Sequence, residues 1–321
     1  MSLTAEAVKA RARELGADLV GIARGETLNR HPPDPRRPQT PERITLEDSR
    51  SVIVLARRIL TGLSRLKGSD DRHKQYSTEL ILADLEEISL KLIYFLEDHG
   101  HPAITVPPMH FDPPSYDPGG DSRGPLSLPH AAVEAGLGTL GLNLMLLTPE
   151  FGPRVLLAGV LTSAPLEPDR PLDTPLCLGE ACGRCLLACP GDAILQWALD
   201  KARCAPHASP YGFTYLTRHL EQVVKAETAE EQLALLKSKE SFMVWQSILR
   251  GVGVYSGCTR CVDVCPVGKD YEEIRDVQEE IPERTPEKET RLAELARRAE
   301  AGDRGPHWAH SARWIQGPGP S

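Results

Sequence analysis

The sequence predicts a mixed α/β (α+β) protein in which an N-terminal α/β domain precedes a smaller cysteine-rich domain. Helical and apolar strand patterns follow each other through the first half, whereas all eight cysteines lie beyond residue 176. A chain of 321 residues, at about 100 to 200 residues per domain, has room for two such domains and a short appendage.

The chain opens with a helix and a strand. Thr4 is a suitable N-cap for a short helix that ends at Gly16, and the apolar segment Asp18–Ala23 is typical of a strand. The segment His31–Pro41 contains five prolines, which lack amide donors, and therefore predicts a surface loop. The apolar run Ser51–Ala56 then predicts a buried strand.

A long amphipathic helix is the clearest element of the first half. Its apolar residues recur at intervals of three and four: Ile81, Leu85, Ile88, Leu92 and Phe95. Gly100 can end this helix, and the segment His101–His130, with eight prolines, predicts a long irregular loop of the kind that is often functional. Arg154–Thr162 predicts a further strand, and the proline-rich stretch Pro165–Pro175 predicts a domain boundary.

These patterns divide the chain into three parts. We expect a cofactor-binding α/β domain over residues 1–165, a cysteine-rich domain over 166–270 with a helical insertion at 216–250, and a helical tail over 271–321. The stretch from Lys269 to Arg304 carries twelve acidic and eight basic residues, which predicts a solvated helical face. From Gly302 onward we expect a disordered terminus.

Composition limits the functional classes. Acidic residues outnumber basic ones by 45 to 37, giving a net charge of −8, and no Lys/Arg-rich run favours nucleic-acid binding. No apolar stretch is long enough for a membrane helix, and the charged residues of the first 23 positions do not fit a signal peptide, so we expect a cytoplasmic protein without membrane contact. Structural disulfides are rare in that compartment, so metals or catalysis must explain the cysteines.

The cysteine spacing predicts two iron–sulfur clusters. One run has the pattern C-x4-C-x2-C-x3-C-P and a second has C-x2-C-x3-C-P, with Cys204 between them. Two-cluster ferredoxins repeat C-x2-C-x2-C-x3-C-P, and the fourth cysteine of each run binds the other cluster. Crossed ligation gives a first cysteine set and a second cysteine set, namely Cys177, Cys182, Cys185 and Cys265, and Cys189, Cys204, Cys258 and Cys261. The alternative is two zinc sites, because C-x2-C pairs also bind zinc.

A literal G-x-G-x-x-G motif stands at Gly136–Gly141. A dinucleotide fingerprint needs a preceding strand and an acidic residue about twenty positions later, and neither is present here. Close approach of the backbone to another large ligand, or a tight turn, explains the glycines better.

The segments around this motif resemble a known family. The stretches Leu15–Ala23, Pro129–Asn143 and Leu147–Arg154, together with the cysteine layout, are similar to epoxyqueuosine reductases and their reductive-dehalogenase relatives over roughly residues 5 to 270. The resemblance implies a nitroreductase-like domain that binds base-off cobalamin, followed by a ferredoxin-like domain with two 4Fe-4S clusters. It places the cofactor contacts in the glycine segment, at Gly136, Gly138, Thr139, Leu140, Gly141 and Asn143.

The proton donor is where the sequence departs from that family. Epoxyqueuosine reductases carry an Asp-Thr-Gly-Pro motif, and alignment on Gly124 places Ser122 where the family has its aspartate. Asp121, one residue earlier, and Tyr116 are the candidate catalytic residues. The roles of His110 and His130 stay open, with helix capping or packing expected for His130.

The resemblance and the cysteines together predict a cobalamin-dependent iron–sulfur reductase of a small molecule. Reduced ferredoxin or flavodoxin would supply electrons. Only 56 residues follow Cys265 and they are acidic, so we do not expect tRNA as a partner. The alternatives are an epoxyqueuosine reductase acting on tRNA, a protein that binds flavin in place of corrinoid, and a ferredoxin-like electron carrier without corrinoid.

Overall fold

A four-stranded antiparallel sheet forms the centre of the protein. The computed structural model describes residues 3–66, 71–108, 123–210, 212–250 and 257–317. The strand order is β1-β2-β6-β3, and every neighbouring pair is antiparallel. The strands are β1 (Leu19–Arg24), β2 (Ser51–Arg58), β3 (Ala103–Val106) and β6 (Val155–Thr162). The mixed α/β class expected from the sequence is therefore confirmed.

The sheet separates two hydrophobic cores. Strand β2 contributes to both because its side chains alternate: Ile53 and Leu55 face one core, whereas Val52 and Val54 face the other. All four side chains are fully buried. This explains why β2 is a continuous apolar run rather than an alternating one.

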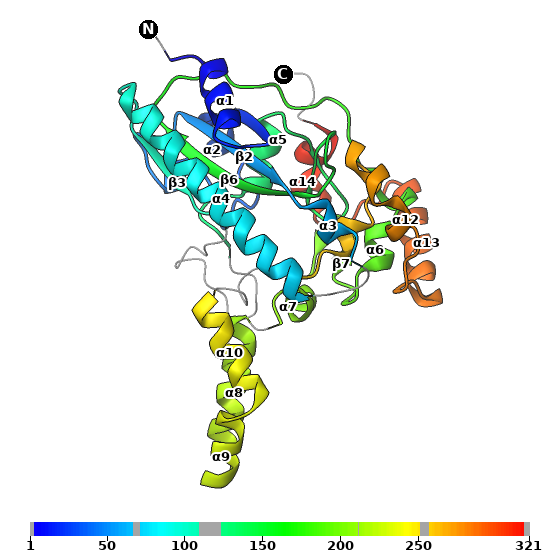
Figure 1. The fold of residues 1–321 in the computed structure, drawn as a ribbon. Coiled ribbons are helices and arrows are strands. Elements are labelled where there is room, and N and C mark those ends of the chain that lie inside the picture. The colour runs from blue at the N-terminus through cyan, green and yellow to red at the C-terminus, as the bar shows by residue number, and fades with distance from the viewer. Residues whose placement is uncertain (1–2, 67–70, 109–122, 211, 251–256, 318–321) are drawn as a thin grey trace.

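Two helices cover one face of the sheet (Figure 1). Helix α1 (Ala5–Glu14) begins at Thr4, whose hydroxyl accepts a hydrogen bond from the amide of Ala7. Helix α4 (Asp71–Asp98) crosses β2, β3 and β6 and buries the apolar stripe that its sequence predicted. The core on this face contains no cysteine among its described members.

The opposite face packs against the cysteine-rich part of the chain. Helices α2 (Gly25–Arg30) and α5 (Leu128–Glu134) lie there with the small hairpin of β4 (Thr139–Leu140) and β5 (Leu146–Leu147). The core on this face runs from β2 into the cysteine-rich part, where it includes Trp197, and into the C-terminal helices. The two parts of the chain thus share one core.

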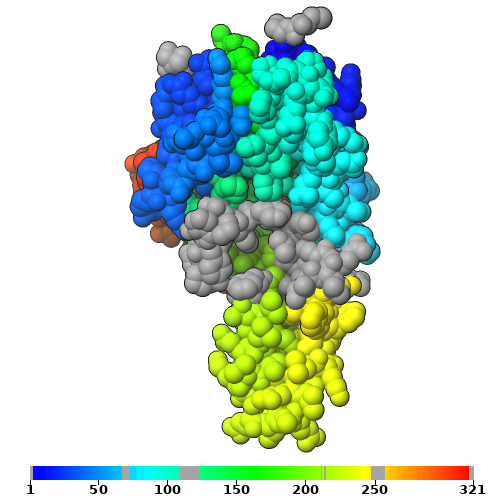
Figure 2. All heavy atoms as spheres, turned by 90° about the vertical axis from the view of Figure 1, so that its left-hand side faces the viewer, coloured from blue at the N-terminus to red at the C-terminus, as the bar shows by residue number. Residues whose placement is uncertain are grey.

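The cysteine-rich part is built from short elements around its loops. They are η3 (Gly179–Ala181), α6 (Arg184–Ala188), β7 (Ile194–Leu195), β8 (Ala198–Leu199), α7 (Lys201–Ala208) and α11 (Arg260–Asp263). The predicted insertion contains α8 (Phe213–Lys225), α9 (Ala229–Leu236) and α10 (Lys239–Arg250). These three helices form an arm that extends away from the sheet in both views (Figures 1 and 2).

The C-terminal tail packs on the protein, which corrects the expectation of a disordered end. The acidic residues of its helices mostly stay exposed, so the expected solvated face is present. The tail contains η4 (Lys269–Glu273), α12 (Arg275–Gln278), α13 (Pro286–Glu300) and α14 (Trp308–Gln316). Helix α13 contacts η3 and α6, and its Lys288 donates to the carbonyl of Cys189 at 2.7 Å. Helix α14 buries Trp314 and Ile315 beside α5 and β4. These two apolar residues therefore hold the C-terminal end in place, although they are too few to predict a core helix from the sequence.

Two short helices, η1 (Pro41–Arg43) and α3 (Thr61–Ser64), complete the described secondary structure. None of the helices that the structure describes is both long and apolar enough to span a lipid bilayer.

Candidate functional site

The eight cysteines lie in three segments that the fold brings together. The first run surrounds η3 and α6, Cys204 lies on α7, and the last three cysteines flank α11. Helices α6 and α11 contact each other, so the two runs lie side by side. All eight thiols are free of disulfide bonds.

The first cysteine set lines one cavity. Cys177, Cys182, Cys185 and Cys265 all border a cavity of about 350 Å³, which Gly141–Asn143 and Val267 help to enclose. A cubane cluster needs four thiolates from such a converging arrangement. Three of these thiols come from the first run and one from the second, as crossed ligation requires.

The members of the second cysteine set are also electrostatic neighbours. Burial and repulsion from Cys258, Cys204 and Cys189 raise the pKa of the Cys261 thiol. Burial and repulsion from Cys258 and Cys189 likewise raise the pKa of the Cys204 thiol. Cys185 of the first set is a neighbour of Cys261 as well as of its own set. The two sets therefore adjoin at Cys185 and Cys261.

Burial makes these thiols poor anions on their own. Burial, with repulsion from Cys258 and Cys189, raises the pKa of Cys204 to about 11. Burial likewise raises the pKa of Cys265 to about 11, although the amide of Val267 and the charge of Arg154 partly oppose this. Only the thiolate binds a metal, so a cationic metal centre is needed to hold these side chains deprotonated at neutral pH.

Backbone amides donate hydrogen bonds to several of the cysteine sulfurs. The amides of Leu142 and Gly179 donate to Sγ of Cys177 at 3.4 and 3.3 Å, and the amide of Ala193 donates to Sγ of Cys189 at 3.2 Å. Such hydrogen bonds stabilise negative charge on sulfur and help to set the reduction potential of an iron–sulfur cluster. The cysteine environment thus fits clusters in donor set, enclosure and hydrogen bonding.

The first glycines of the glycine segment pack against protein backbone. A Cβ atom on Gly136 would lie 2.5 Å from the carbonyl oxygen of Arg170, and one on Gly138 would lie 1.8 Å from that of Leu147. Gly136 also has a φ of +73°. Chain packing and a tight turn account for these two glycines.

The later residues of the glycine segment reach the cysteines. Thr139 and Leu140 are fully buried, and the hydroxyl of Thr139 accepts a hydrogen bond from the amide of Leu176. Gly141 and Asn143 line the cavity of the first cysteine set. The side chain of Asn143 also donates to the carbonyl of Cys261 at 3.3 Å. This part of the segment therefore supports both cysteine sets.

The candidate proton donors Asp121 and Tyr116 lie outside the described residues, as do Ser122 and His110. His130 is described, and it lies in the first turn of α5. Its Nδ1 is 2.6 Å from the hydroxyl of Ser127, and its ring packs edge-on against Trp314 with the centroids 4.5 Å apart. These contacts are those of a packed histidine at a helix start.

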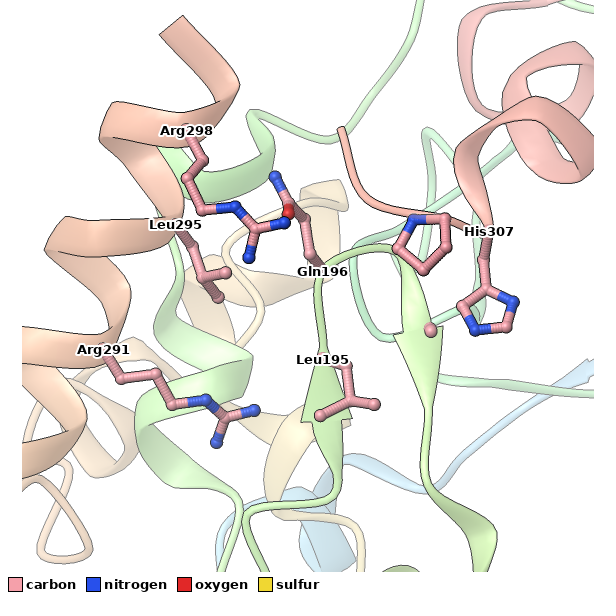
Figure 3. A pocket seen from close by; sticks show the side chains of 8 residues that line it. Leu195, Gln196, Arg291, Leu295, Arg298 and His307 are labelled. Carbon is pink, nitrogen blue, oxygen red and sulfur yellow. The ribbon is translucent and has the colours of Figure 1, made fainter. Parts of the chain in front are cut away.

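A second cavity of about 220 Å³ lies between the β7–β8 hairpin, α13 and the segment before α14 (Figure 3). Gln196, Arg291, Arg298 and His307 are among its lining residues, which include no cysteine. Arg298 is paired with Asp303 at 2.8 Å, and Arg291 donates to the carbonyl of Ile194. Since both guanidinium groups are engaged with the protein, this cavity is not the candidate site.

Sequence patterns gave no sign of two cations that the fold buries beside the cysteines. Lys74 of α4 and Arg154, which precedes β6, are each 1% exposed. Lys74 precedes the apolar stripe of its helix and Arg154 falls at the start of a strand, so neither position indicates contact with the cysteines.

Sequence comparison identifies relatives among two groups of reductases. No protein-family model matches the chain. An epoxyqueuosine reductase of Cyclobacterium marinum is 35% identical over 136 residues, which is 42% of this chain and 34% of that protein. A tetrachloroethene reductive dehalogenase of Sulfurospirillum multivorans is 47% identical over 68 residues, 20% of this chain and 13% of that protein. The chain is a homologue of epoxyqueuosine reductases and reductive dehalogenases.

A third relative covers more of the chain. An epoxyqueuosine reductase of Gloeobacter violaceus is 30% identical over 227 residues, 63% of this chain and 65% of that protein. The chain thus spans less than two thirds of each of these relatives. Among solved structures, a selenomethionine-labelled epoxyqueuosine reductase has a TM-score of 0.51 and 20% identity, and the match covers 97% of this chain and 78% of that one. This likeness supports a shared fold.

The expectation that tRNA is not a partner was based on the acidic tail, and it is wrong. The relatives include epoxyqueuosine reductases, the group for which tRNA is the expected partner.

Proposed function

We propose that this protein is a cobalamin-dependent iron–sulfur reductase. The observation that carries the proposal is the arrangement of eight thiols in two adjoining sets of four, each drawing one or more members from both cysteine runs. The first cysteine set would hold one 4Fe-4S cluster and the second set the other. The relatives, which are named as reductases, support an oxidoreductase role.

The chain's own residues would hold and insulate the clusters. The amides of Leu142, Gly179 and Ala193 would donate to cysteine sulfurs, and Asn143 would tie the glycine segment to the loop of Cys261. Helix α13 would close the site from outside, since Lys288 holds the carbonyl of Cys189. When bound, the clusters supply one-electron transfer.

The assignment of a corrinoid cofactor depends on the resemblance to the two families of relatives. Neither cavity described here encloses a whole corrinoid, because cavities of about 350 and 220 Å³ fall at or below the lower end of the range that holds drug-sized ligands. No step is therefore derived through the corrinoid, and Asp121 and Tyr116 stay predicted proton donors. A corrinoid would supply a metal centre that passes electrons to the substrate.

Anaerobic reconstitution with iron, sulfide and hydroxocobalamin, followed by gel filtration, tests the cofactors. We expect about eight iron atoms per chain, visible absorbance that bleaches on reduction, and retained corrinoid near one per chain. A colourless protein that binds zinc would overturn the cluster assignment. Cluster absorbance without retained corrinoid would leave an electron carrier, and retained flavin would indicate the flavin alternative.

We propose a small molecule as the substrate, as for the relative named after tetrachloroethene. Epoxyqueuosine in tRNA is the second candidate, favoured by the names of the other relatives. The reconstituted protein is given a low-potential reductant with either a halogenated alkene or an epoxyqueuosine-containing tRNA stem loop, and products are measured by mass spectrometry. Turnover of the stem loop alone would overturn the small-molecule proposal.

A further inference from the structure

Three cationic side chains are buried around the second run of cysteines. Arg154, Arg260 and Lys74 are almost fully buried, with 1%, 2% and 1% exposure. Burying a charge costs free energy unless the charge is paired, and replacing a buried ion pair with apolar residues often leaves a protein equally stable. Stability alone is therefore a weak explanation for these cations.

Lys74 reaches the second cysteine set from the α/β part of the chain. Its Nζ lies 2.8 Å from Oδ2 of Asp263, and both side chains are 1% exposed. Oδ2 of Asp263 also accepts a hydrogen bond from the hydroxyl of Thr259, which follows Cys258 directly.

Arg154 reaches the first cysteine set in a comparable way. Its guanidinium donates to the carbonyl of Cys265 at 2.9 Å and to that of Val267 at 2.6 Å. It also forms a two-point ion pair with Asp270, with N–O distances of 2.8 and 2.7 Å.

We propose that Lys74 and Arg154 are positioning residues that set the two cluster potentials separately. Lys74 acts on the cluster of the second cysteine set, and Arg154 acts on the cluster of the first. This inference rests on the proposed function, because it requires that both sets hold 4Fe-4S clusters. Arg260 is excluded from it, because its guanidinium is directed to Glu283 and Gln278 of the tail.

The physical basis is the change of charge on reduction. Each cluster takes up one electron from a donor without gaining an atom, so the site becomes more negative by one charge. A fixed positive charge in a low-dielectric surrounding stabilises that reduced form and raises the potential, and a fixed negative charge lowers it. Neutralising the positive member of an ion pair beside a cluster should therefore lower the cluster's potential, and neutralising the negative member should raise it.

The experiment is an anaerobic redox titration of the reconstituted full chain, with dithionite as reductant, followed by visible and electron paramagnetic resonance spectra. Lys74→Met is expected to disfavour reduction of one cluster about tenfold, which is about 59 mV for a one-electron couple, and to leave the other unchanged. Asp263→Asn is expected to shift the same cluster in the opposite direction. Arg154→Gln should lower the potential of the other cluster, and Asp270→Asn should raise it.

Controls separate charge from packing. Lys74→Arg keeps the charge and should leave both potentials unchanged. Arg57→Gln removes an arginine of the α/β part that is paired with Asp18 and Asp84, and should do the same. Cys182→Ser, which changes one ligand of the first set, assigns the two titration waves.

Several results would overturn the inference. The first is that none of the four charge variants changes either cluster potential. The second is that Lys74→Met and Asp263→Asn shift a potential in the same direction. The third is that Lys74→Met and Arg154→Gln shift the potential of the same cluster. If Lys74→Met fails to load clusters, the test uses Asp263→Asn and Lys74→Arg instead. Asp263→Asn must then raise the potential of one cluster, and Lys74→Arg must leave that potential unchanged. Any other result for these two variants also overturns the inference. Iron analysis comes first, because a wild-type protein without iron and sulfide would instead refute the proposed function.

Discussion

His130 is a packed histidine whose protonation differs between the folded and the unfolded protein. Burial, followed by the nearby charge of Arg123, lowers the pKa of His130 from 6.5 to about 4. The unfolded chain therefore binds a proton on this side chain between those pH values while the folded protein does not. Folding stability should fall as the pH drops through this range.

The comparison of wild type with His130→Gln measures this contribution. Between about pH 7 and about pH 5, the free energy of unfolding of the wild type should fall more steeply, by at most about 1.4 kcal/mol per pH unit, because one proton is involved. Urea unfolding followed by tryptophan fluorescence gives both slopes, and titrations shared by the two proteins cancel. Parallel curves would show that His130 titrates normally in the folded protein.

At the scale of residues, the sequence could predict the cysteines but not their surroundings. Ligand spacing is local, so the runs around Cys182 and Cys261 are visible in the sequence. The Lys74–Asp263 pair joins residues 189 positions apart, and nothing in local pattern links them. The same holds for the amide of Leu142 that reaches Cys177, since a backbone donor has no sequence signature.

At the scale of elements, a strong apolar period predicts a helix or strand correctly, whereas a helix with few apolar residues is missed. Helix α4 and strand β2 follow their apolar patterns, because each buries a long continuous surface. Helix α14 has nine residues, and its anchoring depends on Arg313 and Trp314, which both bond the buried carboxylate of Glu134. The acidic partner of this anchor lies in α5, so a local reading of the tail predicts disorder.

Two tryptophans test the anchoring of α14. Trp314 is 3% exposed and its Nε1 donates to Glu134 at 3.0 Å, whereas Trp245 on helix α10 of the arm is 62% exposed. Trp314→Ala is expected to lower the free energy of unfolding by about 3 kcal/mol, from lost burial and a lost hydrogen bond. The matched Trp245→Ala should change it by less than about 0.5 kcal/mol.

Denaturant unfolding measures both variants, and limited proteolysis shows whether α14 is released in Trp314→Ala. Equal stability losses in the two variants would mean that α14 contributes no more than the arm. A loss confined to Trp245→Ala would contradict the assignment of the tail to the core.

At the scale of the whole molecule, the two cores differ in their dependence on the cysteines. One core joins α1 and α4 to the sheet without a cysteine among its described members. The other contains Cys189 and has Cys177, Cys185, Cys204 and Cys261 packed against it. A metal bound by the cysteines would therefore stabilise one side of the sheet directly and the other only through the shared strands.

Removal of iron is expected to loosen the protein unevenly. Without metal, burial keeps thiols such as Cys204 and Cys265 protonated, so the metal bridges between the two cysteine runs and α7 are lost. Hydrogen–deuterium exchange of chelator-treated protein should accelerate in α6, α11 and α13. Exchange in β2, β6 and the apolar stripe of α4 should stay slow, because each packs one face into the core that has no cysteine among its described members.

Restoring iron and sulfide to the treated protein provides the control, and should return α6, α11 and α13 to slow exchange. Acceleration across β2 and α4 as well would mean that both cores unfold as one unit. Unchanged exchange in α6 and α11 would mean that protein contacts such as Lys288 with Cys189 and Arg154 with Cys265 hold the loops without metal. In that case the buried cations would be sufficient anchors, and the potentials of reconstituted clusters could be varied through Lys74 and Asp263 without loss of the fold.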